Sequence, residues 1–121
     1  ADVPNLHIDL KHQEKYQRIT RTYRNSTIKL FELSVDTSWK FIKEFLWAVH
    51  GINQASPKDV MRTSLQLELL TVDQTSRALD MIDDRNRAAH AYSEKFSNNI
   101  CQKIPEYYAL IQALLDHTKI C

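Results

Sequence analysis

The stretch that decides the fold runs from Ile28 to Gly51 and reads IKLFELSVDTSWKFIKEFLWAVHG. Its apolar side chains recur at spacings of three and four residues, which is the period of an amphipathic α-helix. The stripe consists of Ile28, Phe31, Val35, Trp39, Ile42, Leu46 and Val49, widened by Leu33, Phe41, Phe45 and Trp47. A helix this apolar must be buried on more than one side, and Gly51 suits a left-handed cap at its end.

The residues before this helix predict a separate first helix from about Leu10 to Tyr23. Tyr16 and Ile19 recur there at helical spacing with Tyr23, while basic residues occupy the opposite side. The polar run Arg24–Thr27 follows, and we expect it to break the chain between the first and second helices.

Three further helix starts follow along the chain. Serine caps free helix amides and proline suits the first helical position, so Ser56 and Pro57 predict the start of a third helix. The capping box Thr71–Gln74 opens a fourth, which we expect to run through the motif discussed below. Ser93 caps a fifth helix, which Pro105 is expected to kink or split.

The composition agrees with an all-α protein of one domain. The chain has 121 residues, of which 43% are apolar, and this is enough for one core and too little for two. One glycine and three prolines leave little with which to build hairpin turns or a phosphate-cradling loop. We therefore expect a five-helix antiparallel, up-and-down bundle that forms a single domain over residues 1–121.

Charge and hydropathy exclude several classes of partner. Sixteen basic and fifteen acidic residues give a net charge of +1, so no global field favours nucleic acid or membrane. No apolar run approaches the ~20 residues that span a bilayer, and Cys101 and Cys121 make no disulfide framework. We expect a cytoplasmic protein. The segment Lys11–Lys43 nevertheless holds eight Lys/Arg and only three acids. This segment is either a local phosphate-binding face or an ordinary solvated helix surface.

The motif RNRAAHAY, residues 85–92, holds the strongest chemical candidates. On an ideal helix Arg85 is the one charge within an apolar stripe that spans roughly 60° to either side of it. A guanidinium there is costly unless it is paired or faces a polar cavity. Asn86 and His90, four residues apart, can touch each other but point away from Arg85. A structural ion pair with Glu32, Asp36 or Asp83 is one explanation of Arg85.

The second explanation is catalytic. Arginine supplies a bidentate phosphate clamp, and histidine supplies a proton donor or acceptor near neutral pH. Together they meet the minimum for metal-free RNA cleavage, in which a 2'-hydroxyl attacks its own phosphorus while protons move and negative charge develops.

Four segments, in order, resemble one protein family. DDRNRAAHAY resembles the R-x4-H-x-Y motif of HEPN-domain proteins encoded beside a minimal nucleotidyltransferase (MNT), a branch also called nucleotidyltransferase substrate-binding proteins. IKLFELSVDTSWKFIKEFL is similar to the second helix of this branch, ASPKDVMRTSLQLELL to its third and IPEYYALIQALL to its last. The resemblance covers about residues 28–115.

The resemblance implies a fold, an activity and a partner. HEPN domains are helical bundles that form homodimers with their motifs facing a shared cleft, and many are metal-independent endoribonucleases. Arg85 and His90 then correspond to the catalytic pair, with Asn86 beside them, and RNA to the substrate. Such a toxin is neutralised when the MNT partner transfers AMP from ATP to the motif tyrosine, here Tyr92. ATP is used only by the partner, and neither a resident cofactor nor DNA is implied.

Several alternatives remain. Arg87 stands where the family usually has an apolar residue, so it can contribute to RNA binding or repel the protonated form of His90. A carboxylate-bridged metal site needs an acid three residues before each histidine ligand; His50, His90 and His117 lack it, and Asp9–His12 alone does not make a site. Cys101 has only Lys103 as an activator. The serious competitor to the ribonuclease is a non-catalytic bundle that docks the nucleotidyltransferase and cleaves nothing.

Overall fold

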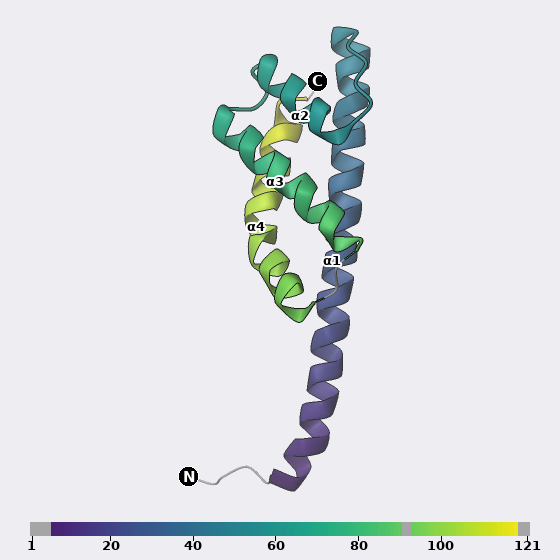
Figure 1. Ribbon diagram of the computed structural model, residues 1–121, viewed down its shortest axis with the longest axis vertical. Coiled ribbons are helices and arrows are strands. Elements are labelled where there is room, and N and C mark those ends of the chain that lie inside the picture. The colour runs from purple at the N-terminus through teal and green to yellow at the C-terminus, as the bar shows by residue number, and fades with distance from the viewer. Residues whose placement is uncertain (1–5, 91–92, 119–121) are drawn as a thin grey trace.

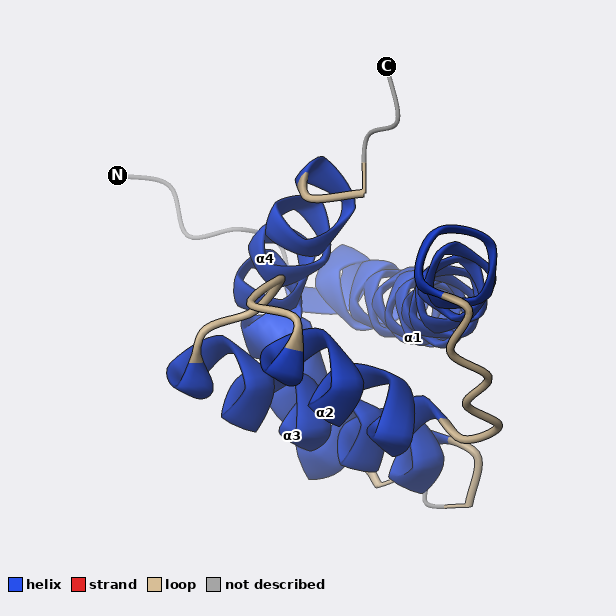
Figure 2. Ribbon diagram, turned by 90° about the horizontal axis from the view of Figure 1, so that it is seen from above, coloured by secondary structure: helices blue, strands red, loops and turns tan. Residues whose placement is uncertain are grey.

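Residues 6–90 and 93–118 are described by a computed structural model, and their regular structure is entirely helical. Within these residues four helices follow one another: α1 (Leu6–His50), α2 (Pro57–Gln66), α3 (Val72–Ala88) and α4 (Glu94–Asp116). α3 runs back against the direction of α1 and α4, and the three shorter helices gather on one side of the C-terminal half of α1 (Figure 1 and Figure 2). The all-α class is confirmed, whereas the predicted count of five helices is wrong for the described residues.

α1 is one continuous helix of 45 residues, so the predicted break at Arg24–Thr27 does not occur. Nothing between the start of α1 and Gly51 is a glycine or proline, and the Thr27 hydroxyl donates to a carbonyl one turn back at 2.8 Å. Arg24 donates to Glu94 (3.2 Å) and Asn98 (3.0 Å) of α4. The polar run therefore docks α4 onto α1 instead of interrupting the helix.

The predicted helix signals mark real ends. Gly51 has a φ of +66° directly after α1. Ser56 caps α2, Ser93 caps α4, and Thr71 forms the reciprocal capping box with Gln74 at the start of α3. The three capping signals work because each needs only a side chain and a backbone group three residues away.

The core lies where the C-terminal half of α1 meets the other three helices. Ile42 and Leu46 of α1 and Met61 of α2 are fully buried, and α3 and α4 close the core with the following buried side chains: Ala78, Met81, Ile82, Ala88, Ile100, Tyr107, Leu110 and Leu114. α4 continues through Pro105, which is exposed, so the proline does not split the helix as one alternative had it. Among the described residues, no helix is both long and apolar enough to cross a membrane.

Candidate functional site

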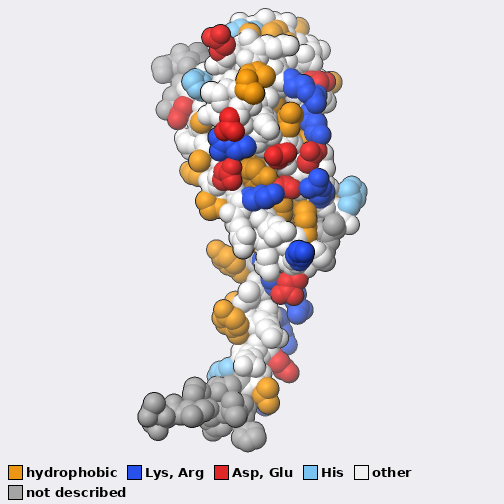
Figure 3. Space-filling model, turned by 60° about the vertical axis from the view of Figure 1, so that its left-hand side comes forward, with side chains coloured by type: hydrophobic (Ala, Val, Ile, Leu, Met, Phe, Trp, Pro, Cys, Tyr) orange, Lys and Arg blue, Asp and Glu red, His pale blue; other side chains and the backbone are white. Residues whose placement is uncertain are grey.

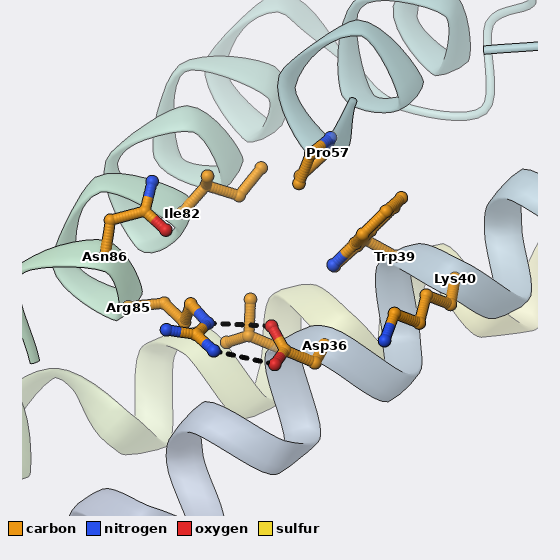
Figure 4. Close-up of a pocket in the computed structure, with 8 residues that line it drawn as sticks. Asp36, Trp39, Lys40, Pro57, Ile82, Arg85 and Asn86 are labelled. Atoms are coloured by element: carbon orange, nitrogen blue, oxygen red, sulfur yellow. Dashed lines mark hydrogen bonds and ion pairs between the residues drawn. The ribbon is translucent and has the colours of Figure 1, made fainter. Parts of the chain in front are cut away.

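Arg85 lies near the C-terminal end of α3 and faces Asp36 on α1. Its Nε donates to Asp36 Oδ1 at 2.7 Å and its Nη2 donates to Oδ2 at 2.8 Å, a bidentate ion pair (Figure 4). The two side chains are 25% and 30% exposed. The structure thus selects Asp36 from the three partners that the sequence offered for a structural ion pair. Asp83, another of them, instead contacts Lys58 of α2 at 2.6 Å.

The pair shifts the pKa of both groups toward the charged state. The hydrogen bond from Arg85, together with its charge, lowers the pKa of Asp36 below its usual value of 3.8 despite partial burial. The hydrogen bond to Asp36 raises the pKa of Arg85 in turn. Both groups are therefore charged at neutral pH, and α1 and α3 are held together across the core edge.

An open pocket of about 320 Å³ adjoins the ion pair, between α1, α3 and the start of α2. Figure 4 shows its wall: Asn86 and Ile82 on α3 lie opposite Trp39 on α1, with Pro57 of α2 between them. The rest of its lining is Val35, Asp36, Lys40 and Arg85. Only two of the five guanidinium N–H donors of Arg85 face Asp36, so the pocket offers cationic and amide groups beside an aromatic ring.

Sequence reasoning did not name Trp39, Lys40 or Pro57 as site residues. Trp39 belonged to the apolar stripe and Pro57 to a helix start, so each already had a structural explanation. The signal that points to them is Asp36 itself. Once Arg85 pairs with Asp36, the residues one turn along α1 must lie beside α3 as well.

His90 does not lie on a helix, contrary to the expectation from periodicity. α3 ends at Ala88, and the backbone N–H of His90 donates to the carbonyl of Arg87 in the turn that follows, at 3.0 Å. Its side chain is exposed and does not line the pocket, whereas Asn86 does. Among the described residues, Asn86 and His90 form no hydrogen bond with each other. Tyr92 lies outside the described residues.

Arg87, expected to serve RNA binding, contacts Asp84 one turn earlier at 3.3 Å. Asp84 is 4% exposed and also accepts from Lys103 (3.4 Å) and from the Tyr107 hydroxyl (2.5 Å) of α4. Burial, and then the hydrogen bond to Asp84, raise the pKa of Tyr107 above its usual value. The Tyr107 ring stacks on Phe31 of α1, with centroids 5.7 Å apart, so this cluster joins three helices.

Comparison with known protein families places the chain in one of them. The family described as nucleotidyltransferase substrate binding protein like matches residues 6–120, almost the whole chain. The chain belongs to this family. The sequence resembles a branch of HEPN-domain proteins that is also called the nucleotidyltransferase substrate-binding proteins, and the family match agrees with this second name. It does not by itself assign a toxin or a ribonuclease.

A solved relative of this nucleotidyltransferase substrate-binding chain shares its fold. A crystal structure of a protein from Thermus thermophilus is 31% identical, with a TM-score of 0.77. The match covers 79% of this chain and 81% of the Thermus chain. No curated protein matches this chain.

Within the described residues, no group of three or more His, Cys, Asp or Glu side chains is placed to hold a metal ion.

Proposed function

We propose that this chain is a non-catalytic module that binds a nucleotidyltransferase and presents the turn after α3 to it. The observation that carries this proposal is the separation of Arg85 from His90. Asp36 holds Arg85 in a bidentate pair, whereas His90 stands exposed beyond the end of α3. A ribonuclease needs its phosphate clamp and its proton-transfer group at one phosphate. A docking module needs only an exposed and well-anchored surface.

The surface beside the turn has suitable chemistry for a protein partner. The pocket combines Trp39 and Pro57 with Lys40 and Asn86, which is the mixture of apolar contact and directed polar groups that protein interfaces use. The capping box anchors the start of α3 and Asp84 anchors its end. The partner therefore meets a preformed surface and loses little binding energy to ordering it.

The motif tyrosine gives the module a role beyond docking. We propose that the bound nucleotidyltransferase transfers AMP from ATP to Tyr92. The phenol oxygen attacks the α-phosphorus, the bond to pyrophosphate breaks, and the phenol proton passes to a base on the partner or to water. His90 and Ser93, the described residues nearest to Tyr92 in the chain, are both exposed. This exposure suits a substrate that must enter another enzyme's active site.

The test uses purified chain and the minimal nucleotidyltransferases encoded in the same genome. Mixed with one of them and ATP, the chain is expected to gain mass in AMP units on the peptide that holds Tyr92. Tyr92→Phe should remove the adduct, whereas Tyr108→Phe, at another exposed tyrosine, should keep it. Lys40→Glu should weaken complex formation by about tenfold. No complex with any of these enzymes, or an adduct that survives Tyr92→Phe, contradicts the proposal.

Metal-independent RNA cleavage is the second candidate, and one observation favours it. Three N–H donors of Arg85 remain beyond those facing Asp36, and Lys40 lines the same pocket, so a phosphate has cations to meet there. His90 then has to come from elsewhere, such as the second subunit of a homodimer, because it does not line this pocket. The toxin activity that the HEPN resemblance implies requires this second function, with RNA as the substrate.

A further inference from the structure

The start of α4 and the N-terminal part of α1 form an open groove that is separate from the pocket beside Arg85. Two adjoining cavities of about 340 and 360 Å³ make up this groove, and each is lined by Arg21, Arg24 and Glu94. It lies at the end of the bundle from which the N-terminal part of α1 projects (Figure 1). Cavities of this size fall within the range of small-molecule sites, about 300–1,000 Å³.

Arg24 is the fixed cation of the groove. Its side chain is only 16% exposed, and its Nη1 donates to Glu94 (3.2 Å) and to Asn98 (3.0 Å) of α4. The Glu94 side chain, in contrast, is 77% exposed, so its carboxylate can leave Arg24 at little cost. The position of that carboxylate therefore marks where an incoming anion meets the Arg24 guanidinium.

Arg21 supplies a second cation that is not engaged elsewhere. It is exposed, and it forms no ion pair or side-chain hydrogen bond with any described residue. Arg21 and Arg24 are three residues apart on α1, so their guanidinium groups can converge on one anion. The first turn of α4 adds the positive end of a helix dipole at the same place. These groups favour a phosphate, which arginine binds through paired hydrogen bonds.

The edge of the groove opposite Arg21 is aromatic. Figure 3 shows hydrophobic side chains along one side of the narrow part of the molecule and Lys and Arg along the other. Tyr16 and Arg21 are roughly 140° apart around α1, and both line the groove. Tyr16 is 71% exposed, so its ring is accessible for stacking on a planar base.

We propose that this groove binds a nucleoside monophosphate group, with the phosphate between Arg21 and Arg24 and the base against Tyr16. One unengaged arginine and one exchangeable ion pair match a single phosphate. Stacking on a tyrosine ring tolerates any base, so the groove selects a class of ligand and not one nucleotide. Of the two interpretations of the basic segment Lys11–Lys43, phosphate binding then applies to these two arginines.

The same chemistry has two sources. Free AMP is one of them. The other is the AMP group that the proposed transfer attaches to Tyr92, which directly precedes the groove residue Ser93 in the chain. A tethered group binds without bulk ligand, because attachment to the chain raises its effective concentration. The tethered source rests on the proposed function, whereas the binding of free AMP does not.

Calorimetric titration of the full chain with AMP tests the groove. AMP is expected to bind more tightly than adenosine or inorganic phosphate, because each of these lacks one of the two contacts. Arg21→Ala should weaken AMP binding at least about tenfold, and Tyr16→Ala at least about fivefold. Arg18→Ala and Tyr23→Ala are the matched controls. They remove exposed side chains of α1 that do not line the groove, so they should leave the affinity unchanged.

Glu94→Gln is expected to increase the affinity, which a general loss of structure cannot mimic. Glutamine keeps the size of the side chain but removes the carboxylate that competes for Arg24, so AMP binding should tighten by about threefold. No measurable binding of AMP overturns the inference. Equal binding of AMP and inorganic phosphate, or an unchanged affinity in Arg21→Ala, overturns it as well.

Chain that a partner enzyme has modified with ATP distinguishes the two sources. With the tethered AMP in the groove, the modified chain is expected to bind free AMP at least about tenfold more weakly than the unmodified chain. A phosphodiesterase should also remove the AMP group faster from Arg21→Ala than from Arg18→Ala. Unchanged binding of free AMP by the modified chain rules out the tethered source and assigns the groove to free nucleotide. A chain that no partner enzyme modifies contradicts the proposed function, while the titrations with free AMP still decide the inference.

Discussion

Replacing Asp84 with alanine is expected to lower the free energy of unfolding by about 2–4 kcal/mol. Asp84 is buried, and its carboxylate is the acceptor for Tyr107 and Lys103 of α4 and for Arg87 of α3. Its loss leaves the buried phenol without an acceptor and separates the end of α3 from α4. Urea denaturation followed by circular dichroism measures the effect.

The neighbouring aspartate provides the matched control. Asp83→Ala removes a half-exposed carboxylate whose partner is Lys58, so it should cost less than about 1 kcal/mol. Tyr107→Phe, which removes one hydrogen bond but keeps the ring on Phe31, should fall between the two variants. Equal stabilities of Asp84→Ala and Asp83→Ala would show that the cluster does not hold α3 in place.

The Arg85–Asp36 pair is expected to show a coupling energy of about 1–2 kcal/mol in a double-mutant cycle. The geometry is bidentate and both side chains are more than two-thirds buried, which places the pair above an exposed salt bridge. The cycle compares Arg85→Ala, Asp36→Ala and the double variant with the wild type. Arg85→Lys should recover only part of the loss, because an ammonium cannot reproduce the two parallel hydrogen bonds. Additive single effects would contradict the structural role.

The same pair predicts a pH dependence with a definite sign. Because the pKa of Asp36 is lowered in the folded state, its contribution is fully present above about pH 4, near the unfolded value of 3.8. It is lost as the pH falls through the lower, folded pKa. The difference in unfolding free energy between wild type and Asp36→Asn should therefore be constant from about pH 7 to about pH 5 and shrink in more acidic buffers. A difference that grows with acid contradicts the assignment.

The predictions that succeeded depend on short-range chemistry. The Ser56 cap, the Thr71 capping box and the turn at Gly51 each involve residues within a few positions of one another. The apolar stripe of α1 predicted one buried face, since Ile42 and Leu46 are fully buried. The expectation that the helix is buried on more than one side was wrong, because Leu33 and Trp47, which widen the stripe, are 62% and 63% exposed. Periodicity is a reliable guide to which side of a helix meets the core.

The predictions that failed depend on contacts far apart in the sequence. Arg24 looks like part of a loop until α4 supplies Glu94 and Asn98, 70 residues or more away. The predicted extent of α3 was wrong for a different reason: no glycine or proline marks its end at Ala88, so no local signal indicated where the helix stops. The position of His90 depends on that end.

The site was predictable in part. The misplaced charge of Arg85 correctly signalled a special contact, but three acids were candidates for the other side, and only packing of α3 on α1 selects Asp36. Arg87 was assigned to RNA although Asp84 lies one turn before it. Asp84 and the buried Ala88 are four residues apart, so they point in nearly the same direction on α3. This spacing was the sequence signal that Asp84 is buried.

RNA digestion in the absence of metal distinguishes a module that binds a nucleotidyltransferase from a nuclease. Purified wild type and His90→Ala are incubated at equal concentration with a mixed-sequence RNA in EDTA, and the products are resolved on a denaturing gel. Intact RNA is expected with both proteins, because Arg85 and His90 do not meet at one site. Cleavage by the wild type that His90→Ala abolishes, while keeping its fold, would contradict the binding-module assignment and establish the ribonuclease.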